Sequence, residues 1–188
     1  NFAFPDLNEC RSKYDAIFIG TGAHVATKIN VELTGGQVFD AVDVLRKIED
    51  DGAESVKLGN NVIVYGGGNT AVDVARTAIR LGCQNVKIVY RRTFDVMPAH
   101  KSELEEALAE GVEILCLRLV KSISDGKVLI EHVNSENDAL IPSGNYEEIA
   151  ADSVIFAVGQ SINQGLFADI PEIKISDKGV IEIDDQMM

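Results

Sequence analysis

The chain has 188 residues, with 17 lysines and arginines against 30 aspartates and glutamates, so its formal net charge at pH 7 is −13. Hydrophobic residues make up 46% of the sequence, and the sixteen glycines and four prolines complete a composition that excludes a disordered or fibrous protein. The acidic charge argues against nucleic acid as a partner. No apolar run reaches the roughly 18 residues that cross a bilayer, and the start of the chain has no targeting pattern. We therefore expect a cytoplasmic chain without membrane insertion, and, because residue 1 is not Met, a piece of a longer protein.

The cysteine and histidine patterns exclude several kinds of site. The sequence has three widely spaced cysteines, which are Cys10, Cys83 and Cys116, and none of them belongs to a CxxC pair. This spacing is typical of reduced thiols and disfavours both a thioredoxin-type dithiol and an internal run of iron–sulfur ligands. The sequence has three histidines, which are His24, His100 and His132. They lack the neighbouring cysteines or carboxylates of a metal site, so no bound metal is predicted.

Three elements are predicted in the first third of the chain. Residues 14–19 form an apolar run that ends at a Gly-Thr-Gly turn, which is the pattern of a buried strand. Residues 37–49 place apolar side chains at helical spacing with charges on the other face, and we predict a helix there. Residues 61–65 are mostly β-branched and lie between glycines, which indicates a second strand.

The middle of the chain alternates helices with strands. Residues 69–81 follow three glycines and carry one apolar stripe, so they are predicted to form a helix that ends at Gly82. Residues 86–90 form the next strand, and a second helix opens at Pro98 and ends at Gly111. The side chains of this helix that we expect to face inward are Leu104, Ala107 and Leu108. The alternation is typical of a parallel sheet with right-handed crossovers.

Antiparallel strands are predicted after the second helix. Residues 112–120 are extended, and Asp125 and Gly126 fit the two-residue turn of a hairpin whose returning strand is 128–133. Residues 134–144 are predicted to be a polar loop. Further strands are expected at residues 146–150 and 153–158. The predicted fold is therefore α/β: a Rossmann-like parallel sheet with flanking helices and an antiparallel β-ribbon, in three layers (ββα).

The best-defined candidate site is the glycine-rich turn GGGNTA at residues 66–71. It fits the GxGxxA dinucleotide fingerprint, follows a predicted strand, opens an amphipathic helix and precedes another strand at the βαβ distance. Gly66 permits the tight turn, Gly68 lets a pyrophosphate approach the backbone, and Ala71 lets helix and strand pack closely. The helix N-terminus offers N–H groups and roughly half a positive charge to the phosphates.

The residues that distinguish NAD from NADP lie at the end of the following strand, about 20 residues after the fingerprint. An NAD site would place a carboxylate there to accept from the ribose 2′-OH, but this chain has Arg91 and Arg92. Guanidinium groups donate paired hydrogen bonds to a 2′-phosphate, so NADP(H) is predicted. His100 and Lys101 either add positive charge to this site or are ordinary surface residues.

Two other patterns are not predicted to form sites. Gly20, Thr21 and Gly22 do not make a second fingerprint, because the third position of the motif is the bulky Val25. The acid-rich helix at residues 102–110 fits a solvated face better than a general acid and base, and no catalytic residue is assigned.

Four segments resemble one family of enzymes. They are residues 14–22 (YDAIFIGTG), 62–81 (VIVYGGGNTAVDVARTAIRL), 86–99 (VKIVYRRTFDVMPA) and 153–160 (SVIFAVGQ). These segments are similar to the small (β) subunit of NADPH-dependent glutamate synthase and its related oxidoreductases, within the two-dinucleotide-domain flavoproteins that include glutathione and thioredoxin reductases. The resemblance covers most of residues 14–165.

The resemblance implies an NADPH-binding domain that is inserted into an FAD domain. Residues 1–36 would cross from the FAD domain, residues 37–160 would form the NADPH-binding domain, and residues 161–188 would return. By motif, the diphosphate would be held by Gly66, Gly67, Gly68, Asn69, Thr70 and Ala71. Arg91 and Arg92 would bind the 2′-phosphate. The turn near the nicotinamide would comprise Val158, Gly159 and Gln160, and the segment nearest the FAD would comprise Gly20, Thr21 and Gly22.

The family's chemistry gives two functional hypotheses. In the first, the chain orients NADPH for hydride transfer to FAD, and electrons pass on to iron–sulfur clusters or a partner subunit. The expected partners are the remaining FAD domain and a large catalytic subunit, and this chain alone is expected to be inactive because it lacks the electron acceptor. In the second, the chain is a docking or redox-sensing module that binds nucleotide without turnover.

Overall fold

The computed structural model describes residues 6–23, 25–26, 31–136, 139–168, 170, 172–176 and 179–185. The chain divides into two compact units. The smaller unit comprises Asn1–Thr27 and Gln160–Met188, and the larger unit is Lys28–Gly159. None of the helices in the described part of the chain has the length and apolar character that a membrane crossing requires.

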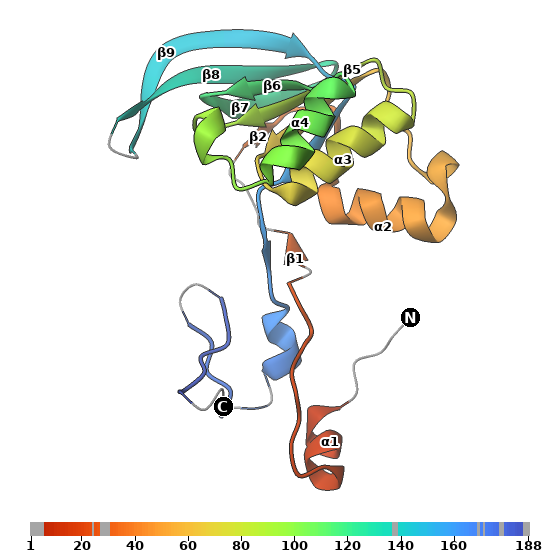
Figure 1. The fold of residues 1–188 in the computed structure, drawn as a ribbon, viewed down its shortest axis with the longest axis vertical. Coiled ribbons are helices and arrows are strands. Elements are labelled where there is room, and N and C mark those ends of the chain that lie inside the picture. The colour runs from red at the N-terminus through yellow and green to blue at the C-terminus, as the bar shows by residue number, and fades with distance from the viewer. Residues whose placement is uncertain are drawn as a thin grey trace. The chain divides into compact units, whose positions relative to one another are not determined.

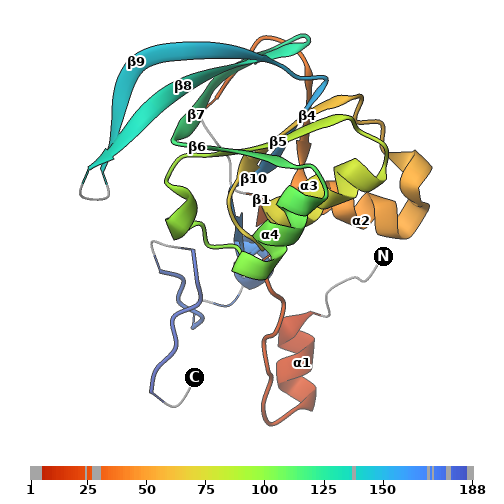
Figure 2. The ribbon, with the colours of Figure 1, turned by 45° about the horizontal axis from the view of Figure 1, so that its top comes forward.

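A five-stranded parallel sheet forms the centre of the larger unit (Figures 1 and 2). Its strands, in spatial order, are β3 (Gln37–Asp40), β10 (Ser153–Ala157), β4 (Asn61–Gly66), β5 (Asn85–Tyr90) and β6 (Glu113–Cys116). Every neighbouring pair runs parallel. All five strands therefore end at the same edge, where the loops that follow them meet. The prediction of a parallel sheet is confirmed.

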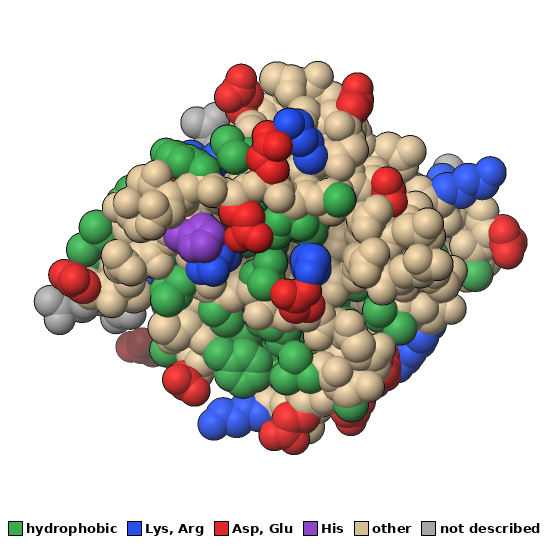
Figure 3. Space-filling view, turned by 90° about the horizontal axis from the view of Figure 1, so that it is seen from above, with side chains coloured by type: hydrophobic (Ala, Val, Ile, Leu, Met, Phe, Trp, Pro, Cys, Tyr) green, Lys and Arg blue, Asp and Glu red, His purple; other side chains and the backbone are tan. Residues whose placement is uncertain are grey.

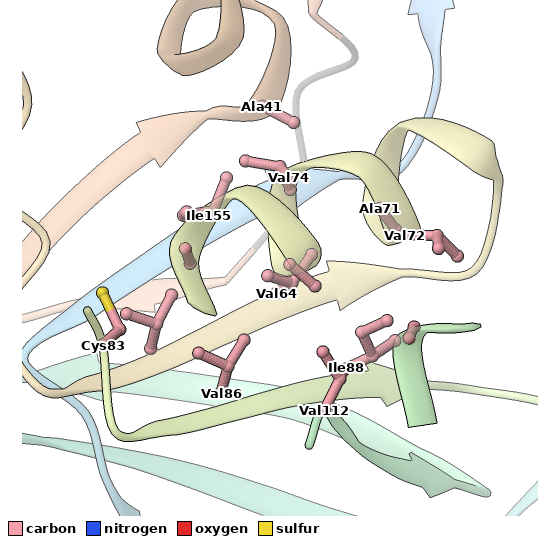
Figure 4. Packing of buried hydrophobic residues seen from close by; sticks show 14 of the residues in the cluster. Ala41, Val64, Ala71, Val72, Val74, Cys83, Val86, Ile88, Val112 and Ile155 are labelled. Atoms are coloured by element: carbon pink, nitrogen blue, oxygen red, sulfur yellow. The ribbon is translucent and has the colours of Figure 1, made fainter. Parts of the chain in front are cut away.

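Three helices cover one face of this sheet: α2 (Ala41–Asp51), α3 (Asn69–Arg80) and α4 (Lys101–Ala109). Figure 4 shows Ala71, Val72 and Val74 of α3 among side chains from the strands beneath, including Val64 and Ile88. All five of these side chains are fully buried. Each buried valine contributes about 1.5–3 kcal/mol through its removal from water, so this helix face anchors the layer.

A second sheet covers the other face. It consists of β2 (Glu32–Leu33), β7 (Arg118–Ser124), β8 (Lys127–Glu136) and β9 (Ala139–Ala150), antiparallel except where β2 pairs with β7. Buried side chains of both sheets form one cluster, which includes Ile63, Val89 and Ile130. The predicted three-layer ββα arrangement is confirmed, as is the hairpin turn at Asp125 and Gly126.

Two side-chain pairs connect neighbouring strands of the second sheet. Lys127 and Glu148 lie 2.7 Å apart, and His132 and Glu147 lie 3.1 Å apart, so both pairs join β8 to β9. Figure 3, seen from above, shows acidic and basic side chains lying beside one another among apolar ones on this face.

The smaller unit contains little regular structure. Its elements are α1 (Leu7–Lys13), β1 (Val25–Ala26), β11 (Gln160–Ser161) and a 3₁₀ turn at Gln164–Phe167. The strands β1 and β11 pair antiparallel.

The predicted strand at residues 14–19 is wrong. The segment is neither helix nor strand, and Phe18 is 95% exposed and Tyr14 65% exposed. A strand needs a neighbour for its backbone N–H and C=O groups, and the described residues of the smaller unit offer this segment none.

Three further predictions need correction in the larger unit. Residues 37–40 are strand β3 rather than the start of a helix, because the Asp40 carboxylate accepts from the N–H of Val42 at 2.9 Å and so caps α2. The predicted loop at residues 134–144 is instead part of β8 and β9 where it is described, because an edge strand can form its ladder with exposed polar side chains. Leu108 is 46% exposed, whereas Leu104 and Ala107 are buried as predicted.

Candidate functional site

The candidate site begins at the turn between β4 and α3. Gly66 has φ +155°, and a Cβ there would lie 2.2 Å from the carbonyl oxygen of Ala157 on the neighbouring strand β10. No side chain fits at that distance. Gly66 is therefore required by the close approach of two backbones, in agreement with the tight turn that the sequence predicts.

The next two glycines have different surroundings. A Cβ on Gly67 would lie 2.4 Å from the ring of Tyr90, whereas a Cβ on Gly68 would meet no atom within 4 Å. Gly68 faces open space at the start of α3, and Ala71 is completely buried against the sheet. The fingerprint predicts this arrangement, in which Ala71 packs closely against the sheet while a ligand has open space at Gly68.

The N-terminus of α3 is free to receive an anion. Gly68 is the N-cap residue, and no side chain caps the first turn within the described part of the chain. The Gly68 carbonyl oxygen accepts from the N–H groups of Ala71 and Val72 at 2.9 and 3.2 Å, so the helix begins immediately. The earlier N–H groups of the turn and the helix dipole are then available to phosphate oxygens.

Residues 93–100, which we call the strap, cross the base of this turn. The Tyr90 hydroxyl donates to the carbonyl oxygen of Val96 at 3.1 Å, and the Ala99 N–H donates to the carbonyl oxygen of Gly67 at 3.1 Å. The His100 N–H donates to Asn69 Oδ1 at 3.0 Å. The strap therefore fixes the strand that precedes Arg91 and Arg92 against the glycine turn.

Arg91 and Arg92 directly follow β5, at the edge where the parallel strands end. Arg91 is exposed and Arg92 is partly buried. Neither guanidinium forms an ion pair with a residue that the structure describes, and the buried Nε of Arg92 has no hydrogen-bond partner there either. Two cations without a carboxylate partner, in a chain of net charge −13, form a local positive site for an anion.

A buried phenol lies behind this edge. Tyr65 is the residue before Gly66, and its ring centroid lies 6.3 Å from that of Phe156 on β10. Burial raises the pKa of the Tyr65 hydroxyl, and the positive charge of Arg91 lowers it to a smaller extent. The phenol is therefore neutral at physiological pH and acts as packing beneath the turn.

The structure brings most of the predicted site residues to one edge of the larger unit. Ala157 pairs with Gly66, so Val158 and Gly159 leave the sheet beside the glycine turn. Gln160 begins β11 in the smaller unit, where it pairs with Ala26. The Gly-Thr-Gly turn at residues 20–22 also belongs to the smaller unit, and the roles predicted for it and for Gln160 stay predictions.

Sequence reasoning missed the hydrogen bonds that hold the site together. Asn69 was predicted to contact the diphosphate, but its side-chain oxygen accepts from the strap. Tyr90 was seen as a strand residue, although its ring packs on Gly67 and its hydroxyl holds Val96. The nearness of the MPA sequence to the YRR sequence is the signal that could have suggested a strap.

The arrangement offers two kinds of group to an anionic ligand. The open N-terminus of α3 fits a diphosphate, and the unpaired guanidinium groups fit a phosphate monoester. The three cysteines are all free, with Cys83 buried and the other two partly buried, so the chain as described has no disulfide.

Comparisons with known proteins agree with this geometry. The sequence pattern of the pyridine nucleotide-disulphide oxidoreductase family matches residues 5–188. The small chain of NADPH glutamate synthase from Halomonas elongata is 32% identical over 193 residues, which span 90% of this chain and 40% of that protein. The β subunit of the NADPH-Fe(3+) oxidoreductase from Geobacter sulfurreducens is 31% identical over 181 residues, 87% of this chain and 26% of that protein.

Two further comparisons concern a shorter match and the fold. The β subunit of NADP(+)-dependent formate dehydrogenase from Moorella thermoacetica is 41% identical over 109 residues, 56% of this chain and 15% of that protein. The chain thus spans less than half the length of these curated relatives. Among solved structures, thioredoxin reductase from T. acidophilum superposes with a TM-score of 0.65 at 16% identity, over 88% of this chain and 50% of that one. This likeness shows the fold.

Proposed function

Because the chain belongs to the pyridine nucleotide-disulphide oxidoreductase family, we propose that its larger unit binds NADPH and orients it for hydride transfer to FAD. The chain is then the NADPH-binding part of an oxidoreductase of the glutamate synthase small-subunit type. Relatives of this kind are named as NADPH enzymes, which supports the choice of nucleotide.

One observation carries the proposal. The open helix N-terminus after Gly68 and the unpaired guanidinium groups of Arg91 and Arg92 lie at the ends of two adjacent parallel strands, β4 and β5. Dinucleotides bind along this edge in Rossmann-like sheets, with the diphosphate on the helix and the adenosine ribose at the next strand. In this arrangement the N-terminus of α3 would face the diphosphate, and Arg91 and Arg92 at the end of the next strand would face the 2′-phosphate.

Each part of the site has a separate task. Bound NADPH supplies the hydride, while the protein supplies position and charge. The backbone of Gly67 and Gly68 lets the diphosphate approach α3, and the strap keeps Arg91 and Arg92 at a fixed place relative to that helix. Val158 and Gly159 leave β10 on the side of the turn away from the arginines, and we assign them to the nicotinamide half.

The remaining functional parts are also proposals. We expect the FAD-binding portion, the iron–sulfur clusters and a large catalytic subunit to be supplied by other parts of a longer protein or by partner chains in the cytoplasm. This fragment alone is then expected to bind NADPH without turnover. Relatives that are named as subunits of glutamate synthase, formate dehydrogenase and an iron(III) oxidoreductase support the existence of partners.

The test is a calorimetric titration of the chain with NADPH and with NADH. We expect tighter binding of NADPH, and we expect Arg92→Glu to weaken NADPH binding roughly 10- to 150-fold, because a hydrogen bond to a charged group contributes about 1.5–3 kcal/mol. Binding of NADH should change less than about twofold, because its ribose carries no phosphate for the new carboxylate to repel.

A matched control separates this contact from a general change of charge. Arg46→Glu makes the same change on α2, where the native side chain is exposed and lies 3.9 Å from Asp43. It should leave both affinities unchanged. Equal affinity of the native chain for the two nucleotides, or binding of neither, would contradict the proposed function.

A further inference from the structure

Arg118 lies two residues beyond β6, the strand that pairs with β5, which Arg91 and Arg92 directly follow. It is the first residue of β7, and β6 ends at Cys116, which pairs with Tyr90 at the end of β5. The Leu117 N–H, between the two strands, donates to the carbonyl oxygen of Arg92 at 3.1 Å. Arg118 therefore follows a backbone that is bonded directly to Arg92.

The bend that carries Arg118 has an unusual backbone. Leu117 has φ +55°, and it is the one non-glycine residue of the described chain with a positive φ. A leucine in the left-handed region is strained, and such strain persists where the surrounding structure holds it. Two backbone hydrogen bonds hold Leu117. Its N–H donates to the carbonyl oxygen of Arg92, and its own carbonyl oxygen accepts from the Val133 N–H at 3.0 Å.

The bend directs the Arg118 guanidinium toward the ends of the parallel strands. Its Nη1 donates to the carbonyl oxygens of Cys116 and Leu117, both at 3.1 Å, so the group is held over the end of β6. These two main-chain carbonyl oxygens thus fix the position of Nη1 in the guanidinium group. The orientation is set before any ligand arrives, which lowers the entropic cost of binding.

The charge of Arg118 is not neutralised by an ion pair. No carboxylate among the described residues lies within ion-pair distance of it, and its buried Nε, like that of Arg92, has no hydrogen-bond partner there. Among the residues that the structure describes, ion pairs hold eight other lysines and arginines, including Arg76 and Lys121. A third unpaired arginine beside Arg91 and Arg92 adds repulsion that an anion would remove.

We propose that Arg118 is a third cation of the NADP site, which recognises the 2′-phosphate monoester together with Arg91 and Arg92. This inference rests on the proposed function. A dianionic monoester has three terminal oxygens, and guanidinium groups that follow the end of β5 and that begin β7 can approach it from two sides. Leu117 and the Cys116 carbonyl then position the Arg118 side chain for this contact.

The experiment measures four ligands on the whole chain: NADPH, NADH, adenosine 2′,5′-bisphosphate and 5′-AMP. Arg118→Gln should weaken the two ligands with a 2′-phosphate about tenfold and change the other two less than about twofold. Arg118→Lys, which keeps the charge but not the planar fork, should restore part of this loss. Arg46→Gln is the control for the loss of a remote arginine.

The ligand pattern separates a binding role from a structural one. If Arg118 only braces the Leu117 bend, Arg118→Gln changes all four affinities together or none of them, and the inference is wrong. A native chain that does not prefer NADPH over NADH overturns the proposed function itself. A preference for NADPH over NADH that is as large in Arg118→Gln as in the native chain overturns only the role of Arg118.

A measurement on the native chain covers the case in which the variants do not fold. Phenylglyoxal modifies accessible arginines, and mass spectrometry locates the sites. Saturating NADPH should protect Arg118 together with Arg92, whereas NADH should leave Arg118 reactive. Equal labelling of Arg118 with both nucleotides would contradict the inference.

Discussion

Gly67 and Gly68 are neighbours in the turn before α3, but different contacts constrain them. A methyl group on Gly67 would meet the Tyr90 ring at 2.4 Å, and that ring is held by its hydroxyl bond to Val96. A methyl group on Gly68 would project into open space, where we propose that the diphosphate binds. Stability and nucleotide binding therefore depend on different glycines.

The two alanine variants should show this separation. Gly67→Ala should lower the free energy of unfolding by about 1–3 kcal/mol, because the ring and the strap must move to make room. Gly68→Ala, at φ −89°, should cost less than about 1 kcal/mol in stability but weaken NADPH binding at least roughly tenfold. Denaturant unfolding and calorimetry measure the two quantities. A stable Gly67→Ala, or a Gly68→Ala with unchanged affinity, would contradict this assignment.

At the level of single residues, the sequence could predict what depends on local backbone. The strand–turn–helix pattern predicts that position 66 requires glycine and that position 71 requires a small residue. The structure shows the close backbone approach at Gly66 and the full burial of Ala71. The contacts of Tyr90 with Gly67, and of Asn69 with His100, join residues 23 and 31 positions apart. No spacing rule covers them, because they depend on how the strap packs. Arg118 had no signal of its own in the sequence.

The helices α3 and α4 are joined by a group of ion pairs at one end. The Glu110 carboxylate accepts from Arg76 Nε and Nη2 at 3.0 and 2.7 Å and from Arg80 Nη2 at 2.8 Å. These bonds lower the pKa of Glu110 to about 2, chiefly through Arg76 and then Arg80. The acid-rich helix was predicted to be a solvated face, but this end of it contacts its neighbour.

This lowered pKa predicts the acid dependence of stability. A carboxyl whose pKa is lower in the folded chain than its ordinary value of 4.5 stabilises the fold above that value, and the contribution is lost as the pH falls from about 4.5 toward about 2. Glu110→Gln should therefore be less stable than the native chain at pH 7 and should show a smaller loss over this interval. Urea unfolding at several pH values measures the slope.

The control for this prediction is Glu105→Gln, at an exposed position on the same helix. It should keep the native acid profile. An identical profile for the native chain and Glu110→Gln would show that the bonds to Arg76 and Arg80 do not persist in solution.

Elements were predictable where apolar spacing and boundary residues agreed. The strand at residues 61–65 and the helix at 69–81 satisfy both criteria, and the structure has them as β4 and α3. The spacing across residues 37–49 hides the boundary at Asp40, because Val38 continues the apolar pattern of α2 backwards into β3. The first half of the edge strand β9 has Leu140 and Ile141 next to Pro142 and Gly144, so it lacks the alternating apolar pattern of a strand, and its pairing with β8 could not be predicted from spacing.

At the scale of the whole molecule, the sequence predicted the layers of the larger unit but not the lack of a strand at residues 14–19 in the smaller unit. Alternating strands and helices indicate a parallel sheet, and the Asp-Gly turn indicates the ribbon that covers it. The apolar run at residues 14–19 has the composition of a buried strand, but burial requires a partner surface that composition does not reveal. The domain limits at residues 36 and 160 stay a prediction.

The smaller unit has a hollow of about 810 Å³ whose lining combines apolar side chains with the charged residues Glu172, Lys174, Glu182 and Asp184. Ile17, Phe18 and Ile19 line it together with Ile173, Ile181 and Ile183, and Phe18 is almost fully exposed. Exposed apolar surface of this kind marks a place where another protein surface binds. If the chain acts as proposed above, the FAD-binding portion would cover this hollow, in keeping with relatives more than twice as long as the matched region.

An environment-sensitive dye such as ANS tests this reading on the chain itself. The native chain should enhance ANS fluorescence, because the hollow offers accessible apolar side chains, and Phe18→Ser should lower the enhancement by removing the most exposed of them. NADPH affinity should not change in Phe18→Ser, because the proposed phosphate-binding residues all belong to the larger unit. Leu108→Ser, at an exposed position on α4, is the control and should leave the fluorescence near the native value. If Phe18→Ser and Leu108→Ser give the same fluorescence, the dye does not bind at the hollow, and the hollow does not offer accessible apolar surface in solution.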